Sequence, residues 1–314
     1  MKIAIATPAA AGTRHGNRTT ADRWAALLRA MGHRVRVQVE WDGAAADVLI
    51  ALHARRSHDS IRRFAETWPE RPIVLALTGT DLYRDIRFDA NARESMRLAT
   101  RMVVLQERGL DELAPDLRRK TRVIYQSARA AACPPLKRCF EIVVSGHLRE
   151  EKDPFRAAQA LAHLPAESRI RITHIGAAMS PEMAQAARAW SEREPRYRWL
   201  GEVAHGKALR LLARARAMVI SSRMEGGANV VSEALAAGTP VLASRIPGNV
   251  GMLGARYRGY FPLEDARALA RLMWRVESDP RFHWLLRQQC RERRRLVTVR
   301  RERESLGRLL AELR

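Results

Sequence analysis

Lysine, cysteine and aromatic residues are scarce in this sequence, and long apolar runs are missing. The three cysteines, Cys133, Cys139 and Cys290, are odd in number and fit neither a disulfide framework nor a zinc-ligand spacing. We therefore expect reduced thiols in a cytoplasmic protein. No segment approaches the ~20 apolar residues that span a bilayer. The apolar start, Lys2–Ala6, is too short for a signal peptide, so neither a leader nor a membrane span is expected.

The charge of the chain is strongly positive because arginine is abundant. There are 56 Lys and Arg against 34 Asp and Glu, a formal net charge of +22, and all but five of the basic residues are arginine. A positive field attracts phosphates, nucleic acid and acidic lipid. Solvated helix faces, an anionic substrate and a basic nucleic-acid-binding protein are the three interpretations. Because aromatic residues make up only 6% and no nucleic-acid-binding motif appears, we expect no nucleic-acid partner.

The length and the apolar pattern predict two domains. A chain of 314 residues is comfortable for two domains of about 150 residues each. Short β-branched runs alternate with helical patterns in both halves, which is typical of parallel sheets covered on both faces. The strands expected in the first half are Lys2–Thr7, Val35–Val39, Val48–His53, Ile73–Thr78, Met102–Gln106 and Arg122–Gln126. Those expected in the second half are Phe140–Ser145, Ile170–Ile175, Arg198–Leu200, Met218–Ser221, Val241–Ala243 and Tyr260–Phe261.

A linker rich in Ala, Pro and Arg, Ala128–Arg138, separates the halves. The predicted fold class is α/β, with two Rossmann-like parallel-sheet domains facing a central cleft, residues 1–138 and 139–294. We expect the basic helical end, about residues 295–314, to pack back on the first domain. A solvated helix face and attachment to a membrane surface are the alternatives. Since ligands of such folds bind at the carboxyl ends of strands, functional loops should directly follow strands.

The loop that opens the second half suits a diphosphate. Gly146 ends a strand, Arg149 and Lys152 follow three residues apart, and Asp153-Pro154 has the order of cap and proline that begins a helix. Two cations at a strand-to-helix turn can neutralise the charge that grows on a departing nucleoside diphosphate. Ordinary surface cations are the alternative interpretation.

The most specific segment runs from Glu225 to Glu233. Gly226 and Gly227 permit close approach of the backbone to a ligand, and a helix is expected to follow until Gly238. Glu233 would lie about two turns along this helix, where its carboxylate can accept two ribose hydroxyls. The predicted donor-binding residues are Gly146, Arg149, Lys152, Gly201, Glu225, Gly226, Gly227, Ala228, Asn229, Val230 and Glu233.

Loops of the first half provide the candidates for an acceptor site. The loop after the first strand is rich in small residues and precedes a helix, so its amides and the helix N-terminus can hold an anion. His53 follows the third strand and is a candidate acid/base group, although a structural histidine is an equal alternative. The predicted acceptor-binding residues are Gly12, Arg14, Asn17, Arg18, His53, Arg55, Arg56, Thr80, Arg84 and Gln126. The predicted catalytic residues are Glu225, His53, Arg149 and Lys152.

The absence of two motifs argues against two classes of enzyme, metal-dependent nucleotide-sugar enzymes and dehydrogenases. The chain contains no Asp-x-Asp pair, the carboxylates through which a metal-dependent nucleotide-sugar enzyme usually holds its diphosphate. We therefore expect no metal and no cofactor, with Arg149 and Lys152 binding the diphosphate directly. No Gly-x-Gly-x-x-Gly follows the first strand, which argues against a dehydrogenase.

The Glu225–Glu233 segment and the Arg149/Lys152 pair resemble the retaining glycosyltransferases of GT-B fold with an E-x7-E motif, the family four type. The resemblance covers essentially the whole chain. It implies that the first glutamate contacts the donor sugar, the second binds ribose, and the two cations bind the diphosphate. Two motifs differ from the usual family pattern: Gly146-His147-Leu148 replaces Gly-Arg-Leu, and Tyr125-Gln126-Ser127 replaces Pro-Asn-Gly.

A narrower resemblance is to the selenosugar synthases of selenoneine biosynthesis. It rests on four segments: His53–Ser57, Thr78–Arg84, Val123–Ser127 and Ser222–Asn229. This resemblance implies transfer from UDP-N-acetylglucosamine or UDP-glucose to selenophosphate, with release of UDP and phosphate. An ordinary glycosyltransferase with a sugar, lipid or natural-product acceptor is the alternative.

Overall fold

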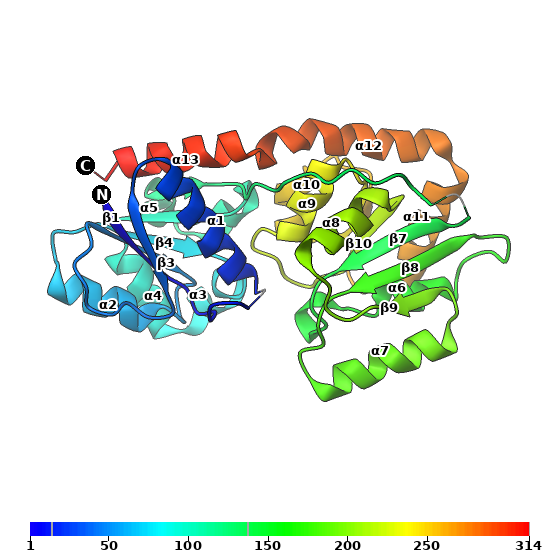
Figure 1. The fold of residues 1–314 in the computed structure, drawn as a ribbon, viewed down its shortest axis with the longest axis horizontal. Coiled ribbons are helices and arrows are strands. Elements are labelled where there is room, and N and C mark those ends of the chain that lie inside the picture. Colours follow the sequence, from blue (N-terminus) through cyan, green and yellow to red (C-terminus); the bar gives the residue numbers. More distant parts are fainter. Residues whose placement is uncertain (14, 137, 314) are drawn as a thin grey trace. The chain divides into compact units, whose positions relative to one another are not determined.

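The computed structural model describes residues 1–13, 15–136 and 138–313, and it divides into two compact units (Figure 1). Unit 1 consists of Met1–Gln126, the short segment Glu225–Ala228 and the chain from Val299 onwards. Unit 2 consists of Ser127–Met224 and Asn229–Thr298. Each unit is built on one six-stranded parallel sheet.

The sheet of unit 1 has the strand order β2-β1-β3-β4-β5-β6. Its strands are β1 (Lys2–Ala6), β2 (Arg34–Gln38), β3 (Val48–Leu52), β4 (Ile73–Leu77), β5 (Arg101–Val104) and β6 (Thr121–Val123). Its helices are α1 (Gly16–Ala30), α2 (His58–Thr67), the π-helical turn η1 (Asp81–Asp85), α3 (Ile86–Phe88), α4 (Ala90–Leu98), the 3-10 turn η2 (Glu107–Glu112), α5 (Pro115–Arg119) and α13 (Val299–Ala311).

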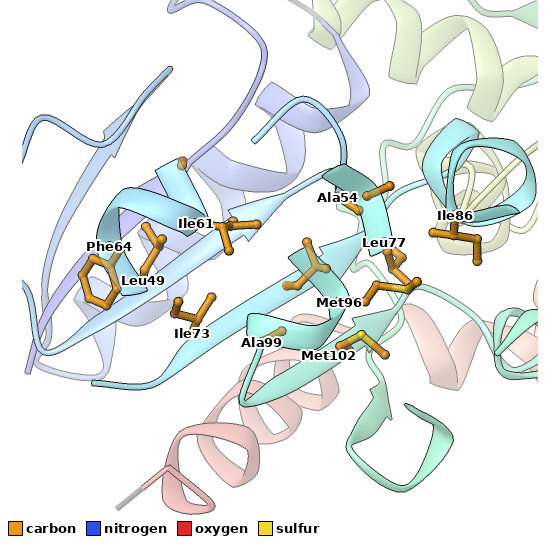
Figure 2. Close-up of a cluster of buried hydrophobic side chains, with 14 of the residues drawn as sticks. Leu49, Ala54, Ile61, Phe64, Ile73, Leu77, Ile86, Met96, Ala99 and Met102 are labelled. Carbon is orange, nitrogen blue, oxygen red and sulfur yellow. The ribbon is translucent and has the colours of Figure 1, made fainter. Parts of the chain in front are cut away.

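Both faces of the central strands are buried, which explains why β3 and β4 read as continuous apolar runs, whereas the edge strand β2 exposes Arg34 and Arg36. Along β3, Leu49 and Ala51 point into a core that includes Ile61 and Phe64 of α2, and Figure 2 shows part of this cluster. The alternate residues of β3 point into a second core on the opposite face, which includes residues of α1 and α13. The alternation follows from the two-residue period of a strand.

Helix α13 is an integral part of unit 1. Leu306, Leu309 and Leu310 belong to its second core. The carboxylate of Glu302, which is 1% exposed, accepts a hydrogen bond of 2.8 Å from the indole Nε1 of Trp24 and lies 3.1 Å from Arg23 Nε. A buried carboxylate with these partners fixes the helix against α1.

The sheet of unit 2 has the strand order β12-β11-β10-β7-β8-β9. Its strands are β7 (Phe140–Ser145), β8 (Ile170–Ile175), β9 (Tyr197–Trp199), β10 (Ala217–Ile220), β11 (Val241–Ser244) and β12 (Tyr260–Phe261). Its helices are η3 (Glu150–Lys152), α6 (Arg156–Leu161), α7 (Pro181–Arg193), α8 (His205–Arg214), α9 (Asn229–Ala237), α10 (Pro247–Leu253), α11 (Ala266–Ser278), α12 (Pro280–Arg294) and η4 (Arg295–Val297).

The two sheets confirm the predicted fold class but differ in topology. Numbered from its own first strand, unit 2 has the order 3-2-1-4-5-6 of dinucleotide-binding domains, whereas unit 1 begins 2-1-3-4-5 as flavodoxin-like folds do. All twelve expected strands are present, and most of their boundaries agree within one or two residues. All three cysteines are free thiols. No helix among the described residues is long and apolar enough to cross a membrane.

One local prediction is wrong. Asp153 does not cap a helix that begins at Pro154, because α6 starts at Arg156 with Phe155 at its N-cap. The backbone of Asp153 is left-handed, with a φ of 44°. Its carboxylate instead pairs with the Arg156 side chain at 2.7 Å. Asp is one of the few residues that tolerate this conformation, so it ends the preceding turn η3.

Candidate functional site

The strand order places the predicted donor loop of unit 2 at a topological switch point. The chain leaves β7 toward β8 on one side and later returns to β10 on the other. In parallel α/β sheets, ligands bind outside the carboxyl ends of two such strands. The loop after β7 carries Gly146, Arg149 and Lys152, and Ser221 follows β10. The predicted diphosphate-binding loop therefore lies where this fold holds ligands.

Hydrogen bonds connect the strand-end loops at this switch point. The Ser221 hydroxyl donates to the carbonyl oxygens of Asp153 at 2.8 Å and Lys152 at 3.2 Å. The Arg223 amide donates to the Glu151 carbonyl at 2.9 Å. The loop that carries the two candidate cations is therefore fixed to the end of β10. The side chain of Arg149 is 45% exposed and lies 4.0 Å from Glu151, so it is accessible to an anion.

Glycines permit the loops after β7 and β8 to lie against each other. A Cβ atom on Gly176 would lie 1.9 Å from the carbonyl oxygen of Gly146, a contact that no side chain permits. The Gly176 amide donates to the carbonyl of Gly201 at 2.8 Å, and Gly201 itself has a φ of 66°. The close packing thus requires glycine at position 176, whereas a Cβ atom on Gly146 or Gly201 would meet no atom within 4 Å. Their predicted contact with a donor stays a prediction.

Glu233 lies on α9, as predicted, and has a partner that the sequence did not reveal. Its side chain is 15% exposed, and Oε1 lies 3.0 Å from Nε2 of His205 on α8. The two residues are distant in sequence and belong to different helices, so no local motif pointed to their contact. Asn229 and Val230 form the start of α9.

The segment Glu225–Ala228 belongs to unit 1, whereas the other donor candidates belong to unit 2. A Cβ atom on Gly226 would lie 2.2 Å from the Thr78 carbonyl oxygen, and one on Gly227 would lie 2.4 Å from Leu105 Cβ. These glycines are therefore needed for packing against the ends of β4 and β5. Glu225 is 8% exposed. Burial raises the pKa of the Tyr83 hydroxyl, and nearby carboxylates, including that of Glu225, raise this pKa further.

In unit 1 two of the predicted acceptor loops follow the strands at its own switch point, β1 and β3, whereas Thr80 and Arg84 follow β4 and Gln126 follows β6. Asp81, which sequence reasoning did not single out, organises the neighbouring loops. Its buried carboxylate accepts hydrogen bonds from the backbone amides of Thr78, Gly79 and Ala54 at 2.8–2.9 Å. The Thr78-Gly79-Thr80-Asp81 motif could have indicated this role of Asp81, because Asp side chains commonly accept hydrogen bonds from nearby backbone amides in turns.

His53 is held rigidly inside this arrangement. It is 2% exposed and has a left-handed φ of 78°, which is rare for a residue other than glycine. Burial lowers the pKa of His53 below its usual value of 6.5, so the ring is neutral. Because Nδ1 accepts from the Arg56 amide at 3.3 Å, the proton lies on Nε2, which donates to Thr80 Oγ1 at 3.0 Å. Its predicted acid/base role stays a prediction.

The other acceptor candidates differ in their surroundings. Arg55 and Arg84 both pair with Asp85, which the sequence analysis also missed. Arg18 pairs with Asp22 at 2.9 Å. Gln126 is buried and donates from its amide nitrogen to Thr20 Oγ1 at 2.6 Å. Gly12 has a φ of 79°, Asn17 lies in the first turn of α1, and Arg56 is exposed, whereas Arg14 lies outside the described residues.

In the described part of the chain, no three or more His, Cys, Asp or Glu residues are grouped so that they could hold a metal ion. The arrangement instead offers cations and backbone amides at the two switch points. Such groups bind anions, and phosphates in particular.

The comparisons with known proteins identify the family. The sequence model described as "Glycosyl transferases group 1" matches residues 136–297, just over half of the chain. The chain belongs to this family. It is therefore a glycosyltransferase, and the family match covers Arg149, Lys152 and Glu233. No curated protein sequence matches the chain.

Solved structures agree with this glycosyltransferase fold. HepE of Anabaena, crystallised with UDP-glucose, has a TM-score of 0.81 at 16% identity, with 100% of both chains covered. Sucrose-phosphate synthase of Thermosynechococcus elongatus has a TM-score of 0.78 at 17% identity, covering 99% of this chain and 98% of that one. The pneumococcal O-GlcNAc transferase GtfA, in complex with UDP and GlcNAc, has a TM-score of 0.67 at 14% identity, covering 85% of this chain and 56% of that one. At these identities the likeness shows the GT-B fold.

Proposed function

We propose that this glycosyltransferase transfers a sugar from a UDP-sugar to a small anionic acceptor, and that the acceptor is selenophosphate. The donor would be UDP-N-acetylglucosamine or UDP-glucose. The proposal of a UDP-sugar donor rests on the position of Arg149 and Lys152. Both lie at the switch point of a dinucleotide-type sheet in a chain of this family. Fold neighbours crystallised with UDP or UDP-glucose support the choice of nucleotide.

The donor site would work by charge neutralisation. As the bond between the anomeric carbon and the diphosphate breaks, negative charge grows on the departing UDP. Arg149 and Lys152 stabilise that charge without a metal ion. Glu233 holds the ribose hydroxyls, and Glu225 contacts the donor sugar. The resemblance to E-x7-E enzymes leads us to expect retention of the anomeric configuration.

The acceptor half rests on the resemblance to selenosugar synthases and on the arginines of unit 1. Selenophosphate is a small, multiply charged anion that needs cations rather than a sugar-binding surface. Its selenium is a soft and strong nucleophile and needs only orientation at the anomeric carbon. A carbon–selenium bond forms while the carbon–oxygen bond to UDP breaks. Water then cleaves the selenium–phosphorus bond, which releases phosphate and leaves the 1-selenosugar.

Mass spectrometry of the products tests both halves. The protein is incubated with UDP-N-acetylglucosamine or UDP-glucose, with and without selenophosphate, in the presence of EDTA. We expect a selenosugar and an equivalent of UDP only when selenophosphate is present. The Arg149→Ala/Lys152→Ala variant should lose the activity.

Two other outcomes would decide against parts of the proposal. UDP release with a sugar, lipid or natural-product acceptor, and none with selenophosphate, would show an ordinary glycosyltransferase of the same family. Loss of all activity in EDTA, restored by a divalent metal, would overturn the metal-independent mechanism.

A further inference from the structure

Two half-exposed arginines of unit 1, Arg55 after β3 and Arg84 in η1, share one buried carboxylate. Arg84 Nε donates to Asp85 Oδ1 at 3.0 Å, and Arg55 Nε lies 3.1 Å from Oδ2 of the same group. The Asp85 side chain is 6% exposed, whereas the side chains of Arg55 and Arg84 are 41% and 47% exposed. The carboxylate therefore lies beneath two guanidinium groups that reach solvent.

Both guanidinium groups contact Asp85 through Nε, the nitrogen nearest the stem of the side chain. Among the described residues, no partner is found for the Nη atoms of either arginine. Each guanidinium therefore keeps its two Nη groups, with four N–H donors, for another ligand. The negative charge of Asp85 also offsets the mutual repulsion that would drive two neighbouring arginines apart.

We propose that Asp85 clamps Arg55 and Arg84 into a single binding site for a tetrahedral oxyanion, the phosphate-like head of the acceptor. This inference rests on the proposed function because it assigns the acceptor to unit 1, and it names Asp85 as the positioning residue. Asp85 itself does not touch the ligand.

The side chains around Arg55 and Arg84 favour binding of an oxyanion over binding of a neutral sugar. A sugar acceptor is usually held by carboxylates and amides that accept from its hydroxyls. The Asp81 carboxylate is already used by three backbone amides, and the Asp85 carboxylate is used by the two arginines. With a neutral His53, the charges of Arg55 and Arg84 balance those of Asp81 and Asp85. The exposed Arg56 adds a further cation nearby.

The proposed clamp and the net charge alone predict opposite changes in anion affinity when Asp85 is neutralised. Removing a negative charge next to two arginines should strengthen anion binding if only the net charge matters. If Asp85 positions the arginines, Asp85→Asn should weaken binding, because an amide offers one acceptor oxygen and cannot serve both Nε groups. Asp85 Oδ2 accepts no regular hydrogen bond among the described residues, so its contact with Arg55 is chiefly ionic and would be lost.

Isothermal titration calorimetry with inorganic phosphate and thiophosphate tests the clamp. All variants are made in the Arg149→Ala/Lys152→Ala background, which removes the proposed diphosphate site of unit 2 as a competing anion site. We expect Asp85→Asn to weaken binding of both probes about tenfold, the scale of one charge-assisted hydrogen bond. Asp111→Asn is the matched control, because Asp111 forms an exposed pair with Arg108 at 3.0 Å in the same unit. It should change the affinity by less than about twofold.

Two further variants keep the net charge and test geometry alone. Arg55→Lys and Arg84→Lys preserve a cation but lose the Nε donor and the planar fork. Each should weaken phosphate binding about as much as Asp85→Asn, and they keep the test decisive if Asp85→Asn does not fold. Equal or tighter phosphate binding by Asp85→Asn, or unchanged binding by both lysine variants, would overturn the clamp.

The proposed function can fail separately from this inference. UDP binding to the protein with Arg149 and Lys152 intact tests the donor half in unit 2, and it does not involve the arginines of unit 1. Clamp-dependent phosphate binding without any transfer to selenophosphate would retain the oxyanion site and reject selenophosphate as the acceptor.

Discussion

Replacing Glu233 should reveal the nucleotide site most directly. Under the proposed function, its carboxylate accepts two ribose hydroxyls, and a hydrogen bond to a charged group contributes about 1.5–3 kcal/mol. The side chain is 15% exposed, so water compensates part of the loss when it is removed. A net loss of about 2–3 kcal/mol corresponds to UDP binding that is about 30- to 150-fold weaker in Glu233→Ala.

Calorimetry with UDP and 2′-deoxy-UDP measures this effect and identifies its origin. Wild-type protein should bind the deoxy analogue more weakly than UDP, whereas Glu233→Ala should bind both alike. Glu192→Ala, on the exposed face of α7 in the same unit, is the control for charge. His205→Ala should weaken UDP binding no more than about threefold, because His205 is 62% exposed. Glu225→Ala should mainly lower turnover.

The ribose assignment would be refuted by equal UDP affinity of wild type and Glu233→Ala. It would also be refuted if Glu233→Ala still discriminated against the deoxy analogue as strongly as wild type does. Failure of the wild type to bind UDP at all would be a different result, because it would reject the nucleotide donor itself.

Three further predictions concern the fold. Glu302→Ala should lower the free energy of unfolding in urea by about 3 kcal/mol, because it removes the buried acceptor of Trp24, and Glu302→Gln should cost less; equal stability of all three proteins would contradict this. Gly226→Ala should lower the melting temperature, since its Cβ would lie 2.2 Å from the Thr78 carbonyl oxygen; an unchanged melting temperature would show that the turn can move. Burial lowers the pKa of His174 from 6.5 to about 3, so the unfolded chain binds the proton first. The free energy of unfolding should therefore fall from pH 6.5 toward pH 3 by up to about 1.4 kcal/mol per pH unit, and His174→Asn should flatten that dependence.

The central strands could be predicted well because they are buried on both faces, as every residue of β3 and β4 is. The predicted segments Phe140–Ser145 and Ile170–Ile175 also match β7 and β8 to the residue, although Arg171 of β8 is exposed. The sheet orders could not be predicted, because the same alternation of strands and helices fits several right-handed connections. The start of α6 was predicted wrongly from Asp153-Pro154, since a turn conformation of Asp153 overrode a good capping signal.

The candidate site could be predicted only in part. Loops that follow strands could be found from the sequence, since strand ends determine where ligands can bind in this fold. The partners of their side chains could not. Asp85 contacts Arg55 across thirty positions of the sequence, and His205 contacts Glu233 from a neighbouring helix. Such contacts depend on tertiary packing, which residue spacing does not encode.

The split composition of unit 1 affects how the protein emerges from the ribosome. Leu306, Leu309 and Leu310 close the second core of unit 1, yet they are translated after all of unit 2. At about 5–20 residues per second, the first sheet waits on the order of ten seconds or more with this face covered by α1 but not yet by α13. The apolar side chains that contact α13 therefore stay uncovered on the nascent chain until α13 has been synthesised.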